Sequence, residues 1–209
     1  EKEMYNAWEI AKGEGLTFLC TPHDEWALDF LEEWGVFDTY KIGSGTVCNK
    51  PLLYAAIDTN KDLIVSTGMH REDQVSYLMG ALDPEKDAIL HCVSEYPTPA
   101  RNANIRYMHH LARMWGGRVG YSDHCEGFGP AVGAAVLGAD IIEKHICVHE
   151  QVPDRQDTLC ALNPTRFKTF VQTVRDACAA TDQSVLHREL TEGEEKTLAW
   201  VRYRDDVEV

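Results

Sequence analysis

Two histidines stand at the ends of two consecutive apolar runs in this sequence. His124 closes the run VGYSDH (119–124), and His145 closes the run DIIEKH (140–145). Imidazole is the commonest neutral ligand for a divalent transition metal, and two such ligands leave coordination positions open for substrate and water. The spacing fits equally well two histidines that make hydrogen bonds at the rim of a sheet. Other histidines lack this placement, and we predict structural or exposed roles for His91, His109, His110 and His149.

Two lysines lie inside apolar runs, where charged side chains are rare unless they are paired or functional. These are Lys41 and Lys144. Either could bind a phosphate or carboxylate as a point charge, or act as a Schiff-base amine. The alternative is a structural ion pair, for which Glu143 and Asp123 are candidate partners of Lys144.

Hydroxyl side chains form the third group of candidates, because one follows each of five different apolar runs. They are Thr21, Ser44, Ser66, Ser94 and Ser122. Five hydroxyls around one rim suit a ligand rich in oxygen atoms, such as a phosphorylated acid. Asp157, in a loop predicted over 146–162, could contact a sugar hydroxyl.

The elements that must position these residues are six β-rich runs separated by amphipathic stretches. The runs are LTFLCTP (16–22), YKIGSG (40–45), LIVSTG (63–68), AILHCVSEYP (88–97), VGYSDH (119–124) and DIIEKH (140–145). Helices are predicted over 1–14, 24–34, 50–59, 71–81, 104–115, 128–138 and 164–180. In the second of these, we expect Trp26, Phe30 and Leu31 to form the inner face. This alternation is typical of a β/α repeat with a parallel sheet.

The polar residues all follow the carboxyl ends of their strands. In a parallel β/α barrel these ends share one face, and that face carries the chemistry. Thr21, Lys41, Ser66, His124 and His145 are therefore predicted neighbours. The predicted fold is α/β, a (β/α)8 barrel of which about six units are present and the first two are missing. A six-stranded doubly wound sheet is the rival, but such a sheet concentrates its site at one switch point.

Composition restricts the partners of this 209-residue chain. A net charge of −14 argues against nucleic acid and anionic membranes, since both need a basic surface. No apolar stretch reaches the roughly 18 residues of a membrane span. Seven cysteines without a C-x-x-C pair indicate a reducing, cytoplasmic location without a disulfide framework.

Taken together, the strings TPHD, YKIGSG, STGM, HCVSEYPTP, VGYSDH, GADIIEKH and DTLCALNP resemble the sialic acid synthase family. That family includes the N-acetylneuraminate, legionaminate and pseudaminate synthases, and the resemblance runs from residue 1 to about residue 200. It implies a (β/α)8 barrel, usually followed by an antifreeze-like domain. It also implies condensation of phosphoenolpyruvate with an N-acetylated hexosamine aldehyde, assisted by Mn²⁺ or Mg²⁺, and a homodimer for the full-length protein.

The same resemblance implies roles for individual residues. His124 and His145 match metal-binding histidines, and Tyr96 matches a tyrosine near the sugar. Phosphoenolpyruvate is expected at Thr21, Lys41, Ser44, Ser66 and Ser122, with Ser94 and Lys144 as weaker candidates. Asp157 matches an acid that binds sugar hydroxyls, and Asp154 is the alternative because PDRQD carries a one-residue insertion.

Two features of the family have no counterpart in this sequence. Its first strand supplies an acid/base glutamate and its second a phosphate-binding lysine, and neither segment is found here. We therefore expect an interior fragment with negligible activity alone, with a partial synthase domain over 1–181. Residues 182–209 are then a short helix or a frayed connector toward the antifreeze-like domain. The competing hypotheses are a Schiff-base aldolase and a chain that binds substrate without turning it over.

Overall fold

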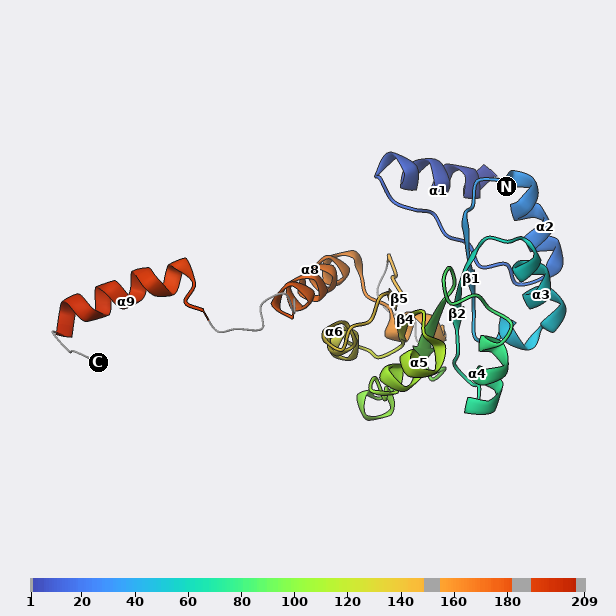
Figure 1. Cartoon of the computed structure of the whole chain (residues 1–209). Coiled ribbons are helices and arrows are strands. Elements are labelled where there is room, and N and C mark those ends of the chain that lie inside the picture. The colour runs from blue at the N-terminus through green and yellow to red at the C-terminus, as the bar shows by residue number, and fades with distance from the viewer. Residues whose placement is uncertain (1, 149–154, 182–188, 206–209) are drawn as a thin grey trace.

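The computed structural model describes residues 2–148, 155–181 and 189–205. Its centre is one parallel sheet whose strands follow one another in chain order, with helices packed along it (Figure 1). The described strands are β1 (Thr39–Ile42), β2 (Asp62–Ser66), β3 (Ala88–Cys92), β4 (Arg118–Asp123) and β5 (Ile142–Lys144). A doubly wound sheet would reverse its strand order at a switch point. The sequential order therefore confirms the β/α-barrel prediction over its rival.

The prediction of a strand over residues 16–22 was wrong. Residues 16–22 make only an isolated bridge, in which Cys20 pairs with Tyr40 and the Lys41 amide donates to the Cys20 carbonyl at 3.0 Å. The segment has β1 on one side only, and Leu16 and Leu19 are 65% and 41% exposed. Among the described residues, the pairing of this run is limited to that bridge, so it is not a strand.

Most helices lie within a few residues of their predicted positions. Their bounds are α1 (Lys2–Gly13), α2 (Glu25–Trp34), α3 (Lys50–Asp58), α4 (Glu72–Met79), α5 (Tyr107–Trp115), α6 (Gly129–Val136), α7 (Gln156–Cys160), α8 (Pro164–Ala180) and α9 (Glu192–Asp205). Short 3₁₀ turns occupy η1 (Thr46–Cys48) and η2 (Ala100–Asn102). Asp24 caps α2 by accepting the Ala27 amide at 2.7 Å, and Asn49 and Asn163 cap α3 and α8 in the same way.

Two details of the helix prediction were wrong. Trp26 is 74% exposed, and the buried residues of α2 are Leu28 and Leu31. Residues two apart on a helix point about 200° apart, so burying Leu28 turns Trp26 outward, where its ring stacks on Phe30. The segment 146–162 is not all loop either, because it contains α7.

The carboxyl-terminal segment contains α9, which confirms the short-helix alternative, and Figure 1 shows this helix apart from the other elements. The proposed division at residue 181 stays a prediction. Within the described part of the chain, no helix is both long and apolar enough to cross a membrane.

Carboxylates anchor the amino-terminal ends of the strands. Asp87, just before β3, is 2% exposed and accepts the amides of Leu63 and Asp83, each at 2.9 Å. Asp140, before β5, accepts the Val119 amide at 2.8 Å but is itself exposed. Each side chain thus extends the hydrogen bonding between two neighbouring strands.

Candidate active site

A cavity of about 860 Å³ opens at the carboxyl ends of the strands. All of the residues singled out from the sequence line it, namely Thr21, Lys41, Ser44, Ser66, Ser94, Tyr96, Ser122, His124, Lys144, His145 and Asp157. The predicted convergence of strand ends on one mouth is thereby confirmed, including for Thr21, whose segment is not a strand. The individual roles of these residues stay predictions.

The two imidazoles lie side by side in this cavity, with ring centroids 5.2 Å apart. His124 Nδ1 lies 2.8 Å from the Val93 carbonyl oxygen, which can only accept, so this nitrogen carries the proton. The Nε2 atom of His124 therefore presents a lone pair, and its nearest hydrogen-bonding partner, Ser122 Oγ, is 3.4 Å away. A ring N–H donated to a backbone carbonyl in this way is typical of histidines that bind metals through the other nitrogen.

Burial also favours the neutral form of His124. The side chain is 5% exposed, and its pKa is lowered, chiefly because desolvation penalises the charged ring, with a further contribution from His145. A neutral imidazole is the form that binds a metal. Among the described residues, no group of three or more His, Cys, Asp or Glu side chains is arranged around a common point. His124 and His145 thus offer two imidazoles in the cavity, and the binding of a metal there stays a prediction.

Tyr96 covers the same pair of rings. Its ring centroid lies 4.2 Å from that of His124 and 6.0 Å from that of His145. The Thr98 amide donates to the His124 carbonyl at 2.8 Å, which holds the loop after β3 against the end of β4. Burial raises the pKa of Tyr96 to about 12, so its hydroxyl remains a neutral donor.

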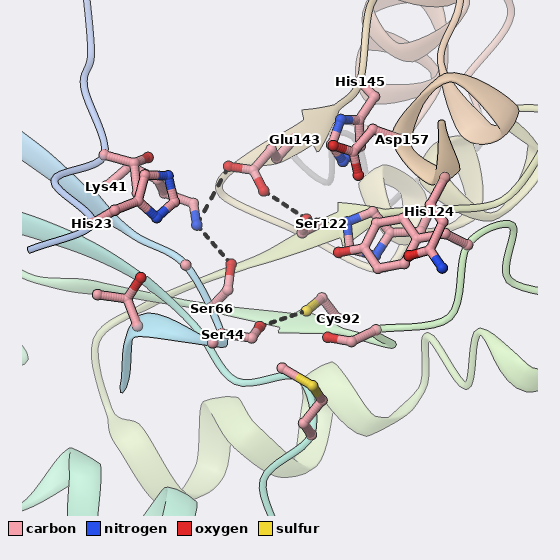
Figure 2. Close-up of a pocket in the computed structure, with 18 of the residues that line it drawn as sticks. His23, Lys41, Ser44, Ser66, Cys92, Ser122, His124, Glu143, His145 and Asp157 are labelled. Carbon is pink, nitrogen blue, oxygen red and sulfur yellow. Dashed lines mark hydrogen bonds and ion pairs between the residues drawn. The ribbon is translucent and has the colours of Figure 1, made fainter. Parts of the chain in front are cut away.

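Lys41 anchors the other side of the cavity. Its ammonium group donates to Ser66 Oγ at 2.8 Å and to the Ile42 carbonyl at 3.1 Å, and it lies 3.6 Å from Glu143 Oε2. Ser122 donates to the other oxygen of Glu143 at 2.6 Å. Figure 2 shows Glu143 between Lys41 and Ser122, in contact with both.

Sequence reasoning missed Glu143 as a cavity residue, although a signal for it exists. Successive residues of a strand alternate between faces, so Glu143 shares a face with His145. In the β4–β5 register, Ser122 is opposite Glu143 and Asp123 is opposite Lys144. The side chains of Ser122 and Glu143 face the cavity. Those of Asp123 and Lys144, one residue further along each strand, therefore point to the opposite face of the sheet.

Lys144 accordingly forms the ion pair that was its structural alternative. Its ammonium group lies 3.0 Å from Asp123 Oδ2 and also contacts the Cys125 carbonyl, and both side chains of the pair are 0% exposed. Lys144 lines the cavity without directing its charge into it. A phosphate role for this side chain gains no support from this geometry.

The backbone at Gly68 lies close against three side chains that line the cavity, those of Ser44, Cys92 and Ser94. The Gly68 amide donates to Ser44 Oγ at 3.0 Å, and Ser44 Oγ lies 3.1 Å from Cys92 Sγ. A Cβ at position 68 would lie 2.4 Å from Ser94 Oγ and 2.6 Å from Cys92 Sγ. Glycine thus lets the backbone approach the hydroxyl groups closely.

Further lining residues were not predicted. His23 follows Thr21 in TPHD, Gln156 precedes Asp157 in the first turn of α7, and Met69 adopts a left-handed φ of 64° at the rim. The alternative acid Asp154 and His149 lie outside the described residues. His91 is buried against the Ala103 carbonyl, and His109 is exposed, as predicted for both.

Comparison with known proteins decides the family. Residues 1–185 match the NeuB family over most of the chain. The chain belongs to the NeuB family. An N,N'-diacetyllegionaminic acid synthase of Legionella pneumophila is 34% identical over 184 residues, covering 85% of this chain and 51% of that protein. A pseudaminic acid synthase of Campylobacter jejuni is 30% identical over 83% of this chain and 51% of its own length. The chain spans about half the length of such NeuB relatives.

A solved structure supports the same assignment. The N-acetylneuraminic acid synthetase of Leptospira borgpetersenii superimposes with a TM-score of 0.83 at 27% identity, covering 99% of this chain and 72% of that one. The NeuB fold therefore extends over the strands and helices that surround the cavity.

Proposed function

We propose that this chain carries the phosphoenolpyruvate-binding and metal-binding part of a nonulosonic acid synthase. The reaction joins phosphoenolpyruvate to an N-acetylated amino-sugar aldehyde, of the N-acetylmannosamine type, and releases phosphate, a transferase reaction. The observation that carries the proposal is the meeting of Lys41, a set of hydroxyls and two imidazoles in one cavity of about 860 Å³. Membership of the NeuB family supports it, because the similar proteins are synthases of legionaminic, pseudaminic and N-acetylneuraminic acids.

The cavity offers separate places for the two substrates. Lys41, which donates to Ser66, is the cationic side, and with Ser44 of the same cavity it suits the phosphate and carboxylate of phosphoenolpyruvate. Tyr96 and Asp157 lie on the imidazole side, where we place the amino sugar. Holding two reactants in this way can remove about 7–11 kcal/mol from a bimolecular barrier.

His124 and His145 are the residues that would hold Mn²⁺ or Mg²⁺. An ion bound there would supply Lewis-acid polarisation of the aldehyde oxygen. The Val93 carbonyl fixes the His124 ring so that Nε2 faces the cavity. In the proposed reaction, the alkene carbon of phosphoenolpyruvate attacks the aldehyde carbon, whose oxygen takes up a proton. Water adds to the resulting cationic carbon and gives up its protons as phosphate leaves by C–O cleavage, which leaves a keto group. Lys41 balances the phosphate charge throughout.

Calorimetric titration of the chain with phosphoenolpyruvate, with and without Mn²⁺, tests this proposal. Lys41→Met removes one charge-assisted contact of about 1.5–3 kcal/mol, so we expect binding to weaken roughly 10- to 150-fold. Lys86→Met is the matched control, because Lys86 is exposed and bonds Asn60 away from the cavity. Unchanged affinity in Lys41→Met overturns the proposed phosphate site.

The metal half is tested in the same titration. His124→Ala is expected to abolish the Mn²⁺ dependence of binding, whereas His109→Ala, at an exposed histidine on α5, leaves it intact. Full Mn²⁺ binding by His124→Ala contradicts the metal assignment.

A Schiff-base aldolase is the second candidate, since Lys41 carries an amine in the cavity. Lys144 is a poor candidate for that role, because its side chain is fully buried. Borohydride reduction with a keto acid would attach the substrate to Lys41 if this candidate were correct. A metal-dependent synthase gives no such adduct.

We also propose a homodimer for the full-length protein and a reducing cytoplasmic location. The latter is supported by the cysteines, because all seven are free thiols in the structure. The absence of turnover by this chain alone stays a prediction.

A further inference from the structure

A second cavity of about 500 Å³ lies between α3 and α4, and its lining differs from that of the candidate active site. Its polar and aromatic lining includes Cys48, Lys50, Tyr54, His70, Asp73 and Tyr77. None of these residues has a part in the proposed synthase reaction. Together they form a cluster that contains a nucleophile, a base and both signs of charge.

Cys48 and His70 form the chemical centre of this cluster. Cys48 ends η1 and is exposed, and its Sγ lies 3.7 Å from His70 Nε2. His70 Nδ1 lies 2.7 Å from the Gly68 carbonyl oxygen, which can only accept, so Nδ1 carries the proton. Nε2 is then left with a lone pair directed at the thiol. A nucleophile, a base and a group that orients the base are the three parts of an activated thiol.

The walls of the cavity would suit a small charged ligand. The Lys50 ammonium group lies over the Tyr77 ring, 4.9 Å from its centroid, and the Tyr54 and Tyr77 hydroxyls are 2.7 Å apart. Asp73 supplies a carboxylate on the same lining. A cation, an anion and two phenols are complementary to a zwitterionic peptide that carries both an amine and carboxylates.

We propose that Cys48 is a modification site that exchanges with low-molecular-weight peptide disulfides of this zwitterionic class. His70 Nε2 takes the thiol proton, and the Cys48 thiolate attacks one sulfur of the disulfide RSSR. A Cys48–SR bond forms, the S–S bond breaks, and the leaving thiolate takes the proton from His70 to give RSH. The exchange consumes one thiol and releases one thiol, so it needs no further oxidant.

The Cys48–His70 pair is close in sequence to residues of the candidate active site. Cys48 follows Ser44 and Thr46 along the chain, and His70 follows Gly68 and Met69. Ser44, Thr46 and Met69 line the candidate active site, so the Cys48–His70 contact joins two segments that contribute to it. The thiol exchange proposed for Cys48 does not depend on which reaction the candidate active site catalyses.

Incubation of the full chain with oxidised glutathione at pH 7, followed by peptide mass spectrometry, tests the proposal. Cys178 on α8 is the internal reference, because it is also exposed and no described imidazole contacts it. A thiol with an ordinary pKa of about 8.5 is only about 3% thiolate at pH 7, so assistance can raise the rate at most about 30-fold. We expect the adduct at Cys48 to form at least about tenfold faster than at Cys178.

His70→Asn is the decisive variant. The amide can still donate to the Gly68 carbonyl, but it has no basic nitrogen, so the Cys48 rate should fall to that of Cys178. Equal rates at the two cysteines in the unaltered chain overturn the proposal without any variant. A Cys48 rate that is unchanged in a folded His70→Asn chain also overturns it.

Discussion

The two ends of the sheet use polar side chains for different purposes. At the amino-terminal end, Asp87 and Asp140 give their oxygens to backbone amides of neighbouring strands. At the carboxyl-terminal end, Ser122, Glu143 and His124 contact one another and leave hydrogen-bonding capacity directed into a cavity. This difference indicates how the two kinds of polar side chain in the fold can be told apart. A side chain whose oxygens accept backbone amides has a structural role, and one that keeps free donors or acceptors facing the cavity can bind a ligand.

The Asp123–Lys144 pair offers the strongest test of this comparison, because it is structural and yet lies at the carboxyl-terminal end. Lys144→Met leaves Asp123 buried without its partner charge, and we expect a loss of about 3–5 kcal/mol in the free energy of unfolding. Lys41→Met should cost under about 1 kcal/mol, since Glu143 is 39% exposed and stays hydrated. Urea denaturation measures both variants. Similar losses of unfolding free energy in Lys144→Met and Lys41→Met would show that the two lysines do not differ in structural role.

These two lysines also show what the sequence could predict. The placement of polar residues after apolar runs was enough to bring the candidates at the strand ends to one cavity, because the β/α repeat determines which ends meet. The direction of each side chain depended on strand register and face. Register places Lys144 beside Asp123 and Glu143 beside Ser122, and it emerges only when β4 and β5 pair.

Other failures have equally local causes. The apolar run at 16–22 has the composition of a strand, but strand formation requires neighbours that the run itself does not specify. Trp26 was expected inside because it is apolar, whereas the rotation of α2 follows Leu28 and Leu31. The Cys48–His70 contact joins two segments that are 22 residues apart, and no spacing rule points to it.

The two carboxylates at the amino-terminal end of the sheet, Asp87 and Asp140, can be compared with each other by substitution. Asp87→Ala leaves two amides without their acceptor at a buried site, and each costs about 1–3 kcal/mol. Asp140→Ala should cost less, because that side chain is exposed and water can replace it at the Val119 amide. Denaturation gives the stabilities, and titration with phosphoenolpyruvate should give unaltered affinities in both folded variants. Weakened affinity in either would mean that this end of the sheet also serves the cavity.

The smallest effect concerns a histidine that sits one residue from a cavity residue on β3. His91 is 6% exposed, whereas the next residue, Cys92, lines the cavity. The pKa of His91 is lowered, chiefly by burial, so the folded state favours the neutral ring. Its contribution to stability is therefore complete above the ordinary pKa of about 6.5, and it is lost as pH falls through the lowered value of the folded state.

Acidification below pH 6.5 should thus destabilise the chain through His91, by at most about 1.4 kcal/mol per pH unit. His91→Phe removes that titration, while the ring can still contact Tyr107 and Tyr121. We expect the unfolding free energy of this variant to depend less steeply on pH, as pH falls below about 6.5, than that of the unaltered chain. His109→Phe, at an exposed position, should keep the original slope. If His91→Phe and His109→Phe both keep the original slope, the burial of His91 does not cause the pH dependence of stability.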